Sequence, residues 1–513
     1  MMSKPLKLAT VFRLSLPDAD SKRSPETPAL RRGSRIIAQG GAPLALGYYP
    51  LVPTGHRFGL LRSHNGRVEK VQLSSLVPAV AAILVSCAAA CLGADAPFTR
   101  PARETYLRIA AETEANLQKE ILQRFFPATL DEQGGGFYEN YSLNWTRMAG
   151  SDKSIVYQSR LTWTSAEAAR RFPAQADMYL AMTRHGAACL ADKLWDKTGG
   201  GFYWQVGADG QPISDIKQMY GHAFGIYALA ASYQATKDQA TLDLARKAFQ
   251  WFEEHSHDKV SKGYFENIGA DGKPVTRGGA SAVGAGAGQK SMNTSIHILE
   301  ALTGLYAVWP DPLLKTRLQE MLELCRDKIY SEPGYLIQFL SADWKPTHSL
   351  DSFGHDVEAG FLMVEAAEAL GQDEPPAWTA ARHLVDHAMQ YGWDKQLGGL
   401  YDAGAMDALG AVTGGLSTEK IWWVQAEHLN ALLLLHEHLR KETSKYWDAF
   451  IKEWGWITKH QVDHTNGGWW PIVQADGTPA SRVKADLWTE CYHQGRAMLT
   501  VSERLRKLAA EEN

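Results

Sequence analysis

The chain has 513 residues, of which 45% are hydrophobic, and its 53 basic and 57 acidic side chains leave a formal net charge of −4. This balance, without basic blocks, lacks the electrostatic signature of a nucleic-acid-binding protein. The chain also carries 17 Trp, 19 Tyr and 16 Phe. Aromatic faces combined with little net charge favour a neutral ligand, such as a sugar, over a phosphate.

The first 67 residues differ in composition from the rest of the chain. They are rich in Pro, Arg, Ser and Gly and show no sustained periodicity, so we expect a disordered or non-native extension. A signal-like segment follows it, although such a segment normally stands at the very start of a protein. We therefore expect translation to begin near Val68 or Val71.

Residues 68–96 have the pattern of a secretory signal peptide. Lys70 precedes a short apolar run at 76–85, and small residues follow that run. The run is too short for a membrane span, and a buried helix of the domain is the alternative interpretation. The pattern predicts a secreted or periplasmic protein. The stretch Leu-Val-Ser-Cys that ends at Cys87 also resembles a bacterial lipoprotein signal, which would make Cys87 a lipid anchor.

From residue 97 to residue 513 we expect one catalytic domain, in which a glycine turn followed by an aromatic or apolar residue occurs six times. The residues that mark the six turns are Phe137, Phe202, Tyr264, Tyr335, Leu400 and Trp469. Along the chain, successive marker residues are 65, 62, 71, 65 and 69 residues apart. A repeat of that length has room for two helices and two turns, so the repetition indicates a ring of helical hairpins.

After each turn, a segment with helical periodicity carries polar residues at a similar offset. These positions are Arg160, His222, His297, His355, the stretch from Trp423 to Glu427, and His493. The third offset is longer because that unit contains the glycine-rich insertion 278–288, which is expected to form a lid. Helical periodicity with only short β segments at the loops predicts an all-α (α/α)6 barrel, with its pocket at one end of the inner helices.

Two of these helices carry a histidine with a carboxylate one turn later. Glu300 follows His297, and Glu358 follows His355, each at a spacing of three residues that shares one helix face. A neighbouring carboxylate fixes the tautomer of an imidazole and makes it more basic, which suits general acid–base catalysis near neutral pH. Two such pairs also occur around metals in helical bundles. The simplest alternative is a buried histidine that is hydrogen-bonded by a neighbouring helix.

Further polar and aromatic residues extend the predicted site. Arg496 follows His493 by one turn, and Arg160 supplies a fixed cation unless it forms an ordinary salt bridge. The adjacent indoles of Trp422 and Trp423 offer broad faces for stacking on a sugar ring. Because neighbouring helical residues point about 100° apart, we expect only one of the two to face the pocket.

Taken together, the motifs resemble the N-acylglucosamine 2-epimerase superfamily, and within it the cellobiose 2-epimerases. They are Met-Tyr-Gly-His at 219–222, Asn-Thr-x-x-His-x-Leu-Glu at 293–300, Gly-His-Asp-x-Glu at 354–358, Trp-Trp-x-Gln-Ala-Glu at 422–427 and Tyr-His-x-Gly-Arg at 492–496. The resemblance covers residues 100–505 in order. It implies an (α/α)6 barrel and inversion of C2 in a reducing-end sugar, without a cofactor or a metal. The chain departs from the family pattern at Ser295, Cys491 and Gln494.

By this resemblance, His297 and His493 are the two catalytic acid/bases. The resemblance also implies a set of residues that bind the mono- or disaccharide substrate, to which Arg496 is added as a candidate: Arg160, His222, Glu300, His355, Glu358, Trp423 and Glu427. The chemistry agrees, since two bases on opposite sides of a sugar can remove a proton next to a carbonyl and return it on the other face. A guanidinium can stabilise the enediolate. We expect a monomer or a homodimer.

Three other functions stay open. Return of the proton to C1 would make an aldose–ketose isomerase of the mannose isomerase type. Glu300 and Glu358 could be the paired carboxylates of a glycoside hydrolase. A sugar-binding protein without catalysis is the third possibility, in which the histidines only form hydrogen bonds.

Overall fold

The computed structural model describes residues 101–347, 350–372, 375–407 and 410–512. These residues belong to one compact unit, Ala94–Asn513. The expected extension at 1–67 and the signal-like segment at 68–96, with its Cys87, lie outside the described residues. Within the described part of the chain, no helix is both long and apolar enough to cross a membrane.

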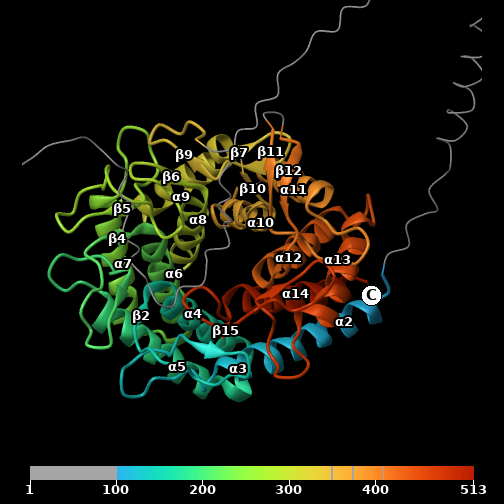
Figure 1. The fold of residues 1–513 in the computed structure, drawn as a ribbon, viewed down its shortest axis with the longest axis horizontal. Coiled ribbons are helices and arrows are strands. Elements are labelled where there is room, and N and C mark those ends of the chain that lie inside the picture. The colour runs from blue at the N-terminus through green and yellow to red at the C-terminus, as the bar shows by residue number, and fades with distance from the viewer. Residues whose placement is uncertain (1–100, 348–349, 373–374, 408–409, 513) are drawn as a thin grey trace, which may run out of the picture. The chain divides into compact units, whose positions relative to one another are not determined.

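Twelve long helices of the described residues form two concentric rings (Figure 1). The inner ring consists of α4 (Ile155–Arg171), α6 (Met219–Thr236), α8 (Met292–Tyr306), α10 (Phe353–Ala369), α12 (Trp422–Leu439) and α14 (Tyr492–Glu511). The outer ring consists of α2 (Arg103–Asn116), α5 (Ala176–Cys189), α7 (Gln239–His255), α9 (Pro312–Leu324), α11 (Pro375–Tyr391) and α13 (Lys445–Trp456). The short α3 (Gln123–Phe125) follows α2. The predicted (α/α)6 barrel is confirmed.

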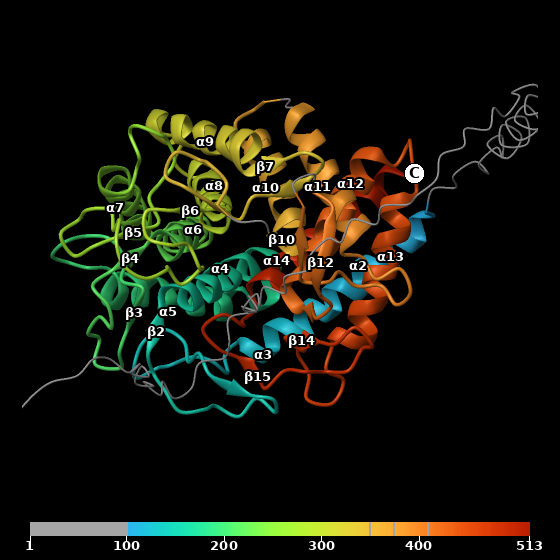
Figure 2. The same ribbon diagram turned by 45° about the horizontal axis from the view of Figure 1, so that its top comes forward.

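The order of the inner helices around the ring decides which side chains face one another. Each inner helix contacts the next, in the order α4, α6, α8, α10, α12, α14 and back to α4. The first outer helix, α2, packs on α14 and closes the outer ring. Helices α8 and α14 are therefore three steps apart and lie on opposite sides of the ring, as Figures 1 and 2 show.

Hydrophobic patterning separates the two rings. On the outer helix α7, the buried residues recur every three or four positions along one face, from Leu242 to Phe252, and the other face is solvated. On the inner helix α12, every residue from Val424 to His436 is buried, because the helix has neighbours on both sides and behind it. An inner helix can therefore carry polar groups only where they have partners or face the centre of the ring.

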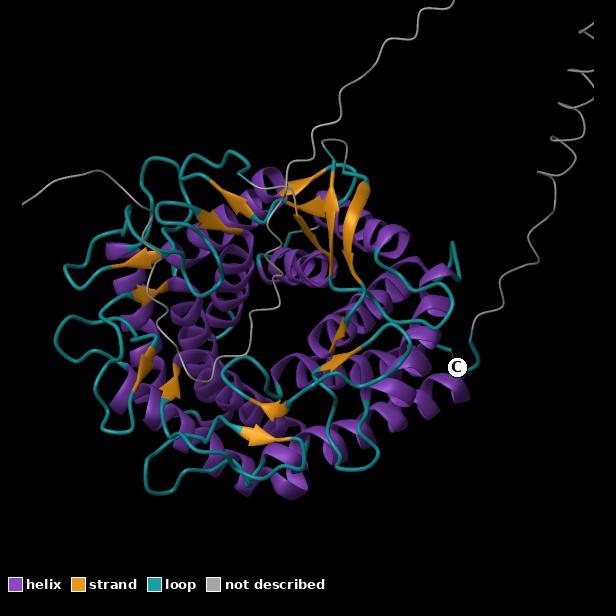
Figure 3. Cartoon of the chain, viewed as in Figure 1, coloured by secondary structure: helices purple, strands orange, loops and turns teal. Residues whose placement is uncertain are grey.

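Short antiparallel strands join neighbouring units, and Figure 3 shows them spaced around the ring. The pairs are β2 (Lys153–Ser154) with β3 (Gln205–Val206), β4 (Lys217–Gln218) with β5 (Asn267–Ile268), β6 (Lys290–Ser291) with β9 (Phe339–Leu340) and β13 (Lys420–Ile421) with β14 (Ile472–Val473). The pair of β7 (Tyr330–Ser331) and β8 (Tyr335–Leu336) lies within one unit. A three-stranded sheet contains β10 (Leu350–Ser352), β11 (Ala403–Met406) and β12 (Val412–Ser417). The pair of β1 (Tyr141–Ser142) and β15 (Val483–Ala485) joins the first unit to the last.

The six glycine turns each close a short antiparallel bridge. The bridged pairs are Leu130 with Phe137, Trp195 with Phe202, His257 with Tyr264, Tyr330 with Leu336, Trp393 with Leu400, and Val462 with Trp469. Gly201 shows why glycine is needed, since its φ is +76° and a Cβ would come within 2.8 Å of the Trp251 ring. The turns therefore set the spacing between one outer helix and the next inner helix.

A buried lysine ties the turn to the start of the next inner helix in five of the units that the structure describes. The ion pairs are Lys153 with Asp131, Lys217 with Asp196, Lys290 with Asp258, Lys420 with Asp394, and Lys484 with Asp463. The fourth unit differs, because Ser331 stands in the place of the turn aspartate and Asp351 in the place of the lysine.

The glycine-rich insertion 278–288 packs against the second unit and its own unit. The Ala282 N–H donates to Gln218 Oε1 at 2.8 Å, and the Ser281 hydroxyl donates to Glu266 Oε1 at 3.3 Å. The insertion therefore lies beside the start of α6. Movement of the insertion as a lid stays a prediction.

Candidate active site

Five inner helices begin in a common register. In α4, α6, α8, α10 and α12 the N–H of the first residue donates to a backbone carbonyl of the following unit. Counted from that first residue, the sixth positions share one level in the ring: Arg160, Phe224, His297, Glu358 and Glu427. This level is the centre of the candidate site, near the amino-terminal ends of the inner helices.

His297 forms a hydrogen-bonded pair with Glu300 on α8. Its Nδ1 lies 2.9 Å from Glu300 Oε2, and the imidazole is only 2% exposed. Burial alone would raise the pKa of Glu300, but the charge of Arg496 lowers this pKa to about 2. Glu300 is therefore ionised at neutral pH and accepts the Nδ1 proton of His297. The Nε2 of His297 is left as a base.

His493 on α14 is held by carboxylates from two neighbouring helices. Its Nδ1 lies 2.6 Å from Glu427 Oε1 and 3.7 Å from Glu358 Oε1. Burial, followed by the charges of Arg160 and Arg496, lowers the pKa of His493 well below its usual range. Burial and the neighbouring Glu358 raise the pKa of Glu427 well above its usual range. The resting imidazole is therefore uncharged, and the pair with Glu427 can hold a proton.

Arg496 joins the two histidine–glutamate pairs. Its Nη1 donates to Glu300, the partner of His297, and its Nη2 donates to Glu427 at 2.8 Å, the partner of His493. Nη2 also donates to Glu358. Three carboxylates, from α8, α10 and α12, thus converge on one guanidinium from α14. The network makes the positions of the two imidazoles depend on each other.

Arg160 on α4 has both an ion pair and a place at the site. Its Nη1 donates to Glu490 Oε1 at 2.9 Å, and its Nη2 donates to the Tyr220 hydroxyl at 2.9 Å. The guanidinium carbon lies 4.3 Å from the centre of the Phe224 ring, which in turn packs against His297 with a centroid distance of 4.7 Å. Arg160 thus forms the ordinary salt bridge that was the alternative interpretation, and it also lies at the level of the site.

The second predicted histidine–glutamate pair does not form. His355 Nδ1 lies 2.7 Å from the Ser352 hydroxyl, while Glu358 binds Arg496. Burial lowers the pKa of His355 to about 3, so its imidazole is neutral. The ring lies 4.7 Å from the ring of Trp423, which makes His355 and Trp423 one wall of the site.

The two adjacent indoles have different surroundings. Trp423 lies 5.5 Å from the His493 ring, between centroids, and is partly exposed. Trp422 is 8% exposed and belongs to the hydrophobic core. Trp423 is therefore the indole that is available to a ligand.

His222 is not brought together with the other predicted site residues. Its Nδ1 accepts the Phe202 N–H at 3.3 Å, and its Nε2 lies 3.1 Å from the Ala248 carbonyl, which accepts the proton of Nε2. The rings of Trp251 and Phe252 stack on the imidazole. Both nitrogens are thus used in tying α6 to the turn and to α7, and the geometry does not support a role in binding substrate.

The same connection recurs at the fourth position of other inner helices. The Gln158 side chain accepts from the Phe137 N–H, Gln425 accepts from the Leu400 N–H, and Asp356 accepts from the Leu336 N–H. In α4, α6, α10 and α12 the fourth position therefore binds the glycine turn, whereas the sixth position faces the centre of the ring. In α8 the fourth residue, Ser295, donates to the Ser291 carbonyl of its own helix instead.

Sequence reasoning missed several residues of the site. They are Tyr220, Phe224, Glu490 and Tyr492. Tyr220 and Tyr492 stand inside the quoted motifs at 219–222 and 492–496, beside the histidines that drew attention, and the register of the helices would have identified Phe224. Glu490 precedes its helix and had no such signal.

One carboxylate–imidazole cluster of the site has the composition of a metal site. Ligand atoms of Glu358, Glu427 and His493 lie within 4.8 Å of one another. Arg496, however, donates to both carboxylates, so a guanidinium already supplies the positive charge at this cluster. The geometry fits acid–base chemistry better than metal binding.

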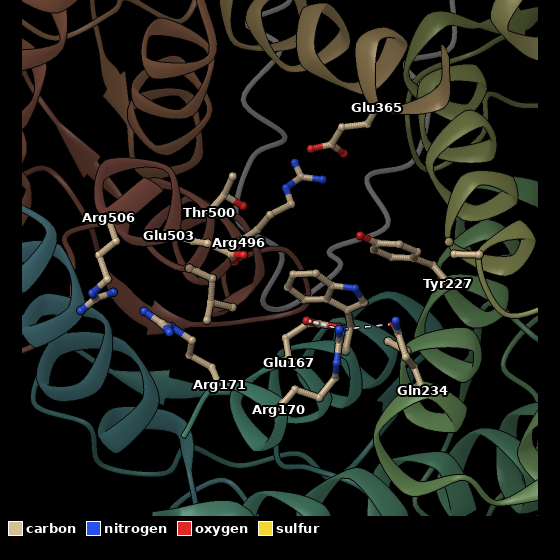
Figure 4. Close-up of a pocket in the computed structure, with 15 residues that line it drawn as sticks. Glu167, Arg170, Arg171, Tyr227, Gln234, Glu365, Arg496, Thr500, Glu503 and Arg506 are labelled. Carbon is tan, nitrogen blue, oxygen red and sulfur yellow. Dashed lines mark hydrogen bonds and ion pairs between the residues drawn. The ribbon is translucent and has the colours of Figure 1, made fainter. Parts of the chain in front are cut away.

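A cavity of 540 Å³ lies at the other end of the inner ring (Figure 4). Its lining includes Glu167 and Arg170 of α4, Gln234 of α6 and Glu365 of α10, all near the carboxyl ends of their helices. Arg496 also lines this cavity, and Figure 4 shows its side chain reaching toward Glu365. Arg496 thus stands between the cavity and the histidine pair.

Comparisons with known proteins identify the family of the chain. A model of the N-acylglucosamine 2-epimerase family matches residues 136–497. The chain belongs to this family. It is 30% identical over 392 residues to a cellobiose 2-epimerase of Bacteroides fragilis, covering 74% of this chain and 96% of that protein. The structure of the cellobiose 2-epimerase of Spirochaeta thermophila superposes with a TM-score of 0.70 at 31% identity, covering 79% of this chain and 98% of the other.

The chain is also similar to proteins with another name. A D-mannose isomerase of Marinomonas mediterranea is 23% identical over 397 residues, covering 74% of this chain and 93% of that protein. These relatives are isomerase-class enzymes that act on carbohydrates. The family member described here is an enzyme of the same class.

Proposed function

We propose that the protein is a sugar 2-epimerase that inverts C2 of a reducing-end aldose with His297 and His493 as its two acid/bases. The observation that carries this proposal is the placement of two histidines, each paired with a glutamate, on α8 and α14, on opposite sides of the ring. A planar intermediate between them can lose a proton on one face and gain one on the other.

Each half of the inversion uses one of the pairs. In one direction, Nε2 of His297 removes the C2 proton of the open-chain sugar, and the electron pair moves to the C1 oxygen to give an enediolate. His493 then delivers a proton to the opposite face of C2 while Glu427 supplies one to its Nδ1. The raised pKa of Glu427, caused by burial and Glu358, supports this role as the proton source. The reverse reaction exchanges the two roles.

Arg160 is the candidate for stabilising the enediolate. Its guanidinium is buried beside Phe224 and Tyr220, whose rings pack against His297. Hydrogen bonds to Glu490 and Tyr220 fix its direction. A cation already held in place stabilises developing negative charge without reorganisation, which is the usual source of large electrostatic effects in active sites. Trp423 and His355 form the wall against which a sugar ring can stack.

The names of the relatives point to cellobiose, a disaccharide, as the substrate. Incubation of the purified protein with cellobiose, followed by separation of the sugars, should yield glucosyl-mannose. If no epimer and no ketose formed from cellobiose, glucose or mannose, the proposal would be wrong.

Aldose–ketose isomerisation is the second candidate, because a D-mannose isomerase is among the relatives. It would require the proton to return to C1 rather than to C2. The same incubation separates the two activities, since isomerisation of mannose gives fructose and epimerisation gives glucose. Glycoside hydrolysis is disfavoured because Glu300 and Glu358 both bind Arg496 instead of forming a free acid and base.

We also propose that the protein is exported, on the strength of the signal-like segment 68–96. Fractionation of cells that produce the full chain would test this, with Cys87→Ser as the variant that removes the candidate lipid anchor.

A further inference from the structure

The fourth unit lacks the buried ammonium that closes the corresponding junction in its neighbours. In four other units the residue two positions before the inner helix is a buried lysine: Lys153, Lys217, Lys290 and Lys420. In the fourth unit this position is Asp351, in β10. A carboxylate thus stands where the fold elsewhere places a cation, and no turn aspartate remains for a lysine to bind, because that position is Ser331.

Two more ionisable groups point at Asp351. Asp356 on α10 and His387 on α11 are 0% and 4% exposed, and Asp351 is 0% exposed. His387 Nδ1 lies 3.4 Å from Asp351 Oδ2 and 3.9 Å from Asp356 Oδ2. Among the described residues, these three atoms and Asp351 Oδ1 have no hydrogen-bond partner. Two buried carboxylates without a countercharge are costly, so they must either share a proton or bind a positive partner.

The spacing of these atoms fits a metal ion. Ligand atoms at about 2.1 Å from a tetrahedral zinc ion are about 3.4 Å apart, close to the separations within this cluster. All three ligand atoms lie within 4.8 Å of one another.

The outer contacts are those of preorganised metal ligands. The Nε2–H of His387 donates to the Gly410 carbonyl at 2.8 Å, which leaves Nδ1 as a lone pair directed at the carboxylates. Asp356 accepts the Leu336 N–H on Oδ1 at 2.9 Å, which leaves Oδ2 free. Hydrogen bonds of this kind to the distal atom orient the ligands of bound metals.

We propose that Asp351, Asp356 and His387 bind one divalent transition-metal ion, with zinc or manganese as the candidates. Two carboxylates neutralise a divalent charge and suit manganese, and an imidazole nitrogen suits zinc. The ion would take the place of the lysine ammonium of the other units. It joins β10, the start of α10 and the outer helix α11, and so holds the helix that carries His355 and Glu358.

The metal has no part in the proposed epimerisation, so its test is independent of that proposal. The full chain is purified without chelators from medium supplemented with zinc and manganese chlorides, and its metal content is measured by mass spectrometry. We expect about one equivalent of zinc or manganese per chain, and at least a roughly tenfold lower content in Asp351→Asn and in His387→Gln. Glu427→Gln, in the carboxylate–imidazole cluster of the active site, is the matched control and should keep the ion.

A measurement on the wild-type chain covers the case in which these variants fail to fold. Dialysis against EDTA should lower the melting temperature, and zinc or manganese chloride, but not calcium chloride, should restore it. The proposal would be overturned if the wild-type chain contained no metal, or if EDTA did not change its melting temperature. It would also be overturned if Glu427→Gln lost the metal and Asp351→Asn kept it. Such results would mean that the two carboxylates share a proton instead.

Discussion

Arg496 on α14 forms a buried ion pair with Glu300 on α8, the helix on the opposite side of the ring. Glu300 holds one histidine of the site, and Arg496 also binds the carboxylate that holds the other histidine. Both imidazoles are therefore positioned by one network that spans the ring. Removal of one member of a buried ion pair is costly because the remaining charge loses its partner.

Replacement of Arg496 tests this network. Arg496→Lys keeps the charge, but a single ammonium cannot reproduce the fork that binds carboxylates from three helices. We expect kcat to fall by about 10²-fold, since misplacement of catalytic groups by about 1 Å has an effect of that size. Steady-state kinetics with cellobiose measure it.

Arg506→Lys is the control for this substitution. Arg506 lines the cavity at the other end of the ring and binds Glu114 near the surface. Its replacement should leave kcat within about twofold, as expected of a surface ion pair. If Arg496→Lys were as active as Arg506→Lys, the network would have no part in positioning the histidines.

His222→Gln tests whether His222 is a packing residue. Gln158 and Gln425 occupy the same helix position and bind their turns through both side-chain atoms, so glutamine should fit without loss of activity. Burial lowers the pKa of His222 to about 3, whereas an unfolded histidine titrates near its ordinary value of 6.5. Below pH 6.5 the unfolded chain therefore binds a proton that the folded chain does not bind. The unfolding free energy consequently decreases as the pH is lowered.

The contribution of His222 can be read from the pH dependence of unfolding. Its burial should cost about 2 kcal/mol of unfolding free energy at pH 5 and almost nothing above pH 7. Denaturant titrations should show that His222→Gln is less sensitive to acid than the wild-type chain by this amount, while exposed His464→Gln is unchanged. A large loss of activity in His222→Gln at pH 7, with the fold intact, would speak for substrate binding instead.

The adjacent indoles provide a matched pair of substitutions. Trp423→Leu removes a stacking wall beside His355 and His493 and should raise KM for cellobiose about tenfold, with a small effect on stability. Trp422→Leu empties part of the core and should lower the unfolding free energy by about 3 kcal/mol, with little effect on KM. Kinetics and denaturant titrations of both variants check the assignment, and an exchange of the two effects would contradict it.

The repeat architecture could be predicted from sequence because glycine turns and helical periodicity are local signals. Gly200 and Gly201 adopt backbone angles that other residues avoid, and that requirement leaves a mark in every unit. The architecture then restricts the site to the inner helices. That much needs no knowledge of tertiary contacts.

The positions within the helices could not be assigned from turn offsets alone. His222 and Phe224 differ by only two positions, but two helical residues are about 200° apart, which moves a side chain from the turn to the centre of the ring. The spacing of three residues was equally ambiguous, since His297 binds Glu300 whereas His355 does not bind Glu358. Partners from other helices decide these cases, and such contacts leave no local pattern.

Deuterium exchange at C2 by single-histidine variants tests the central claim most directly. His297→Gln and His493→Gln are each incubated in heavy water with cellobiose and, separately, with glucosyl-mannose, and C2 is followed by NMR. Both variants should fold, and both should lose inversion by at least about 10²-fold. Each should still exchange the C2 proton of one epimer, and the two variants should differ in which epimer that is. The claim that two imidazoles act on opposite faces of the sugar would be contradicted by either of two results. One is inversion by either variant at a rate near that of the wild type, and the other is exchange of the C2 proton of the same epimer by both variants.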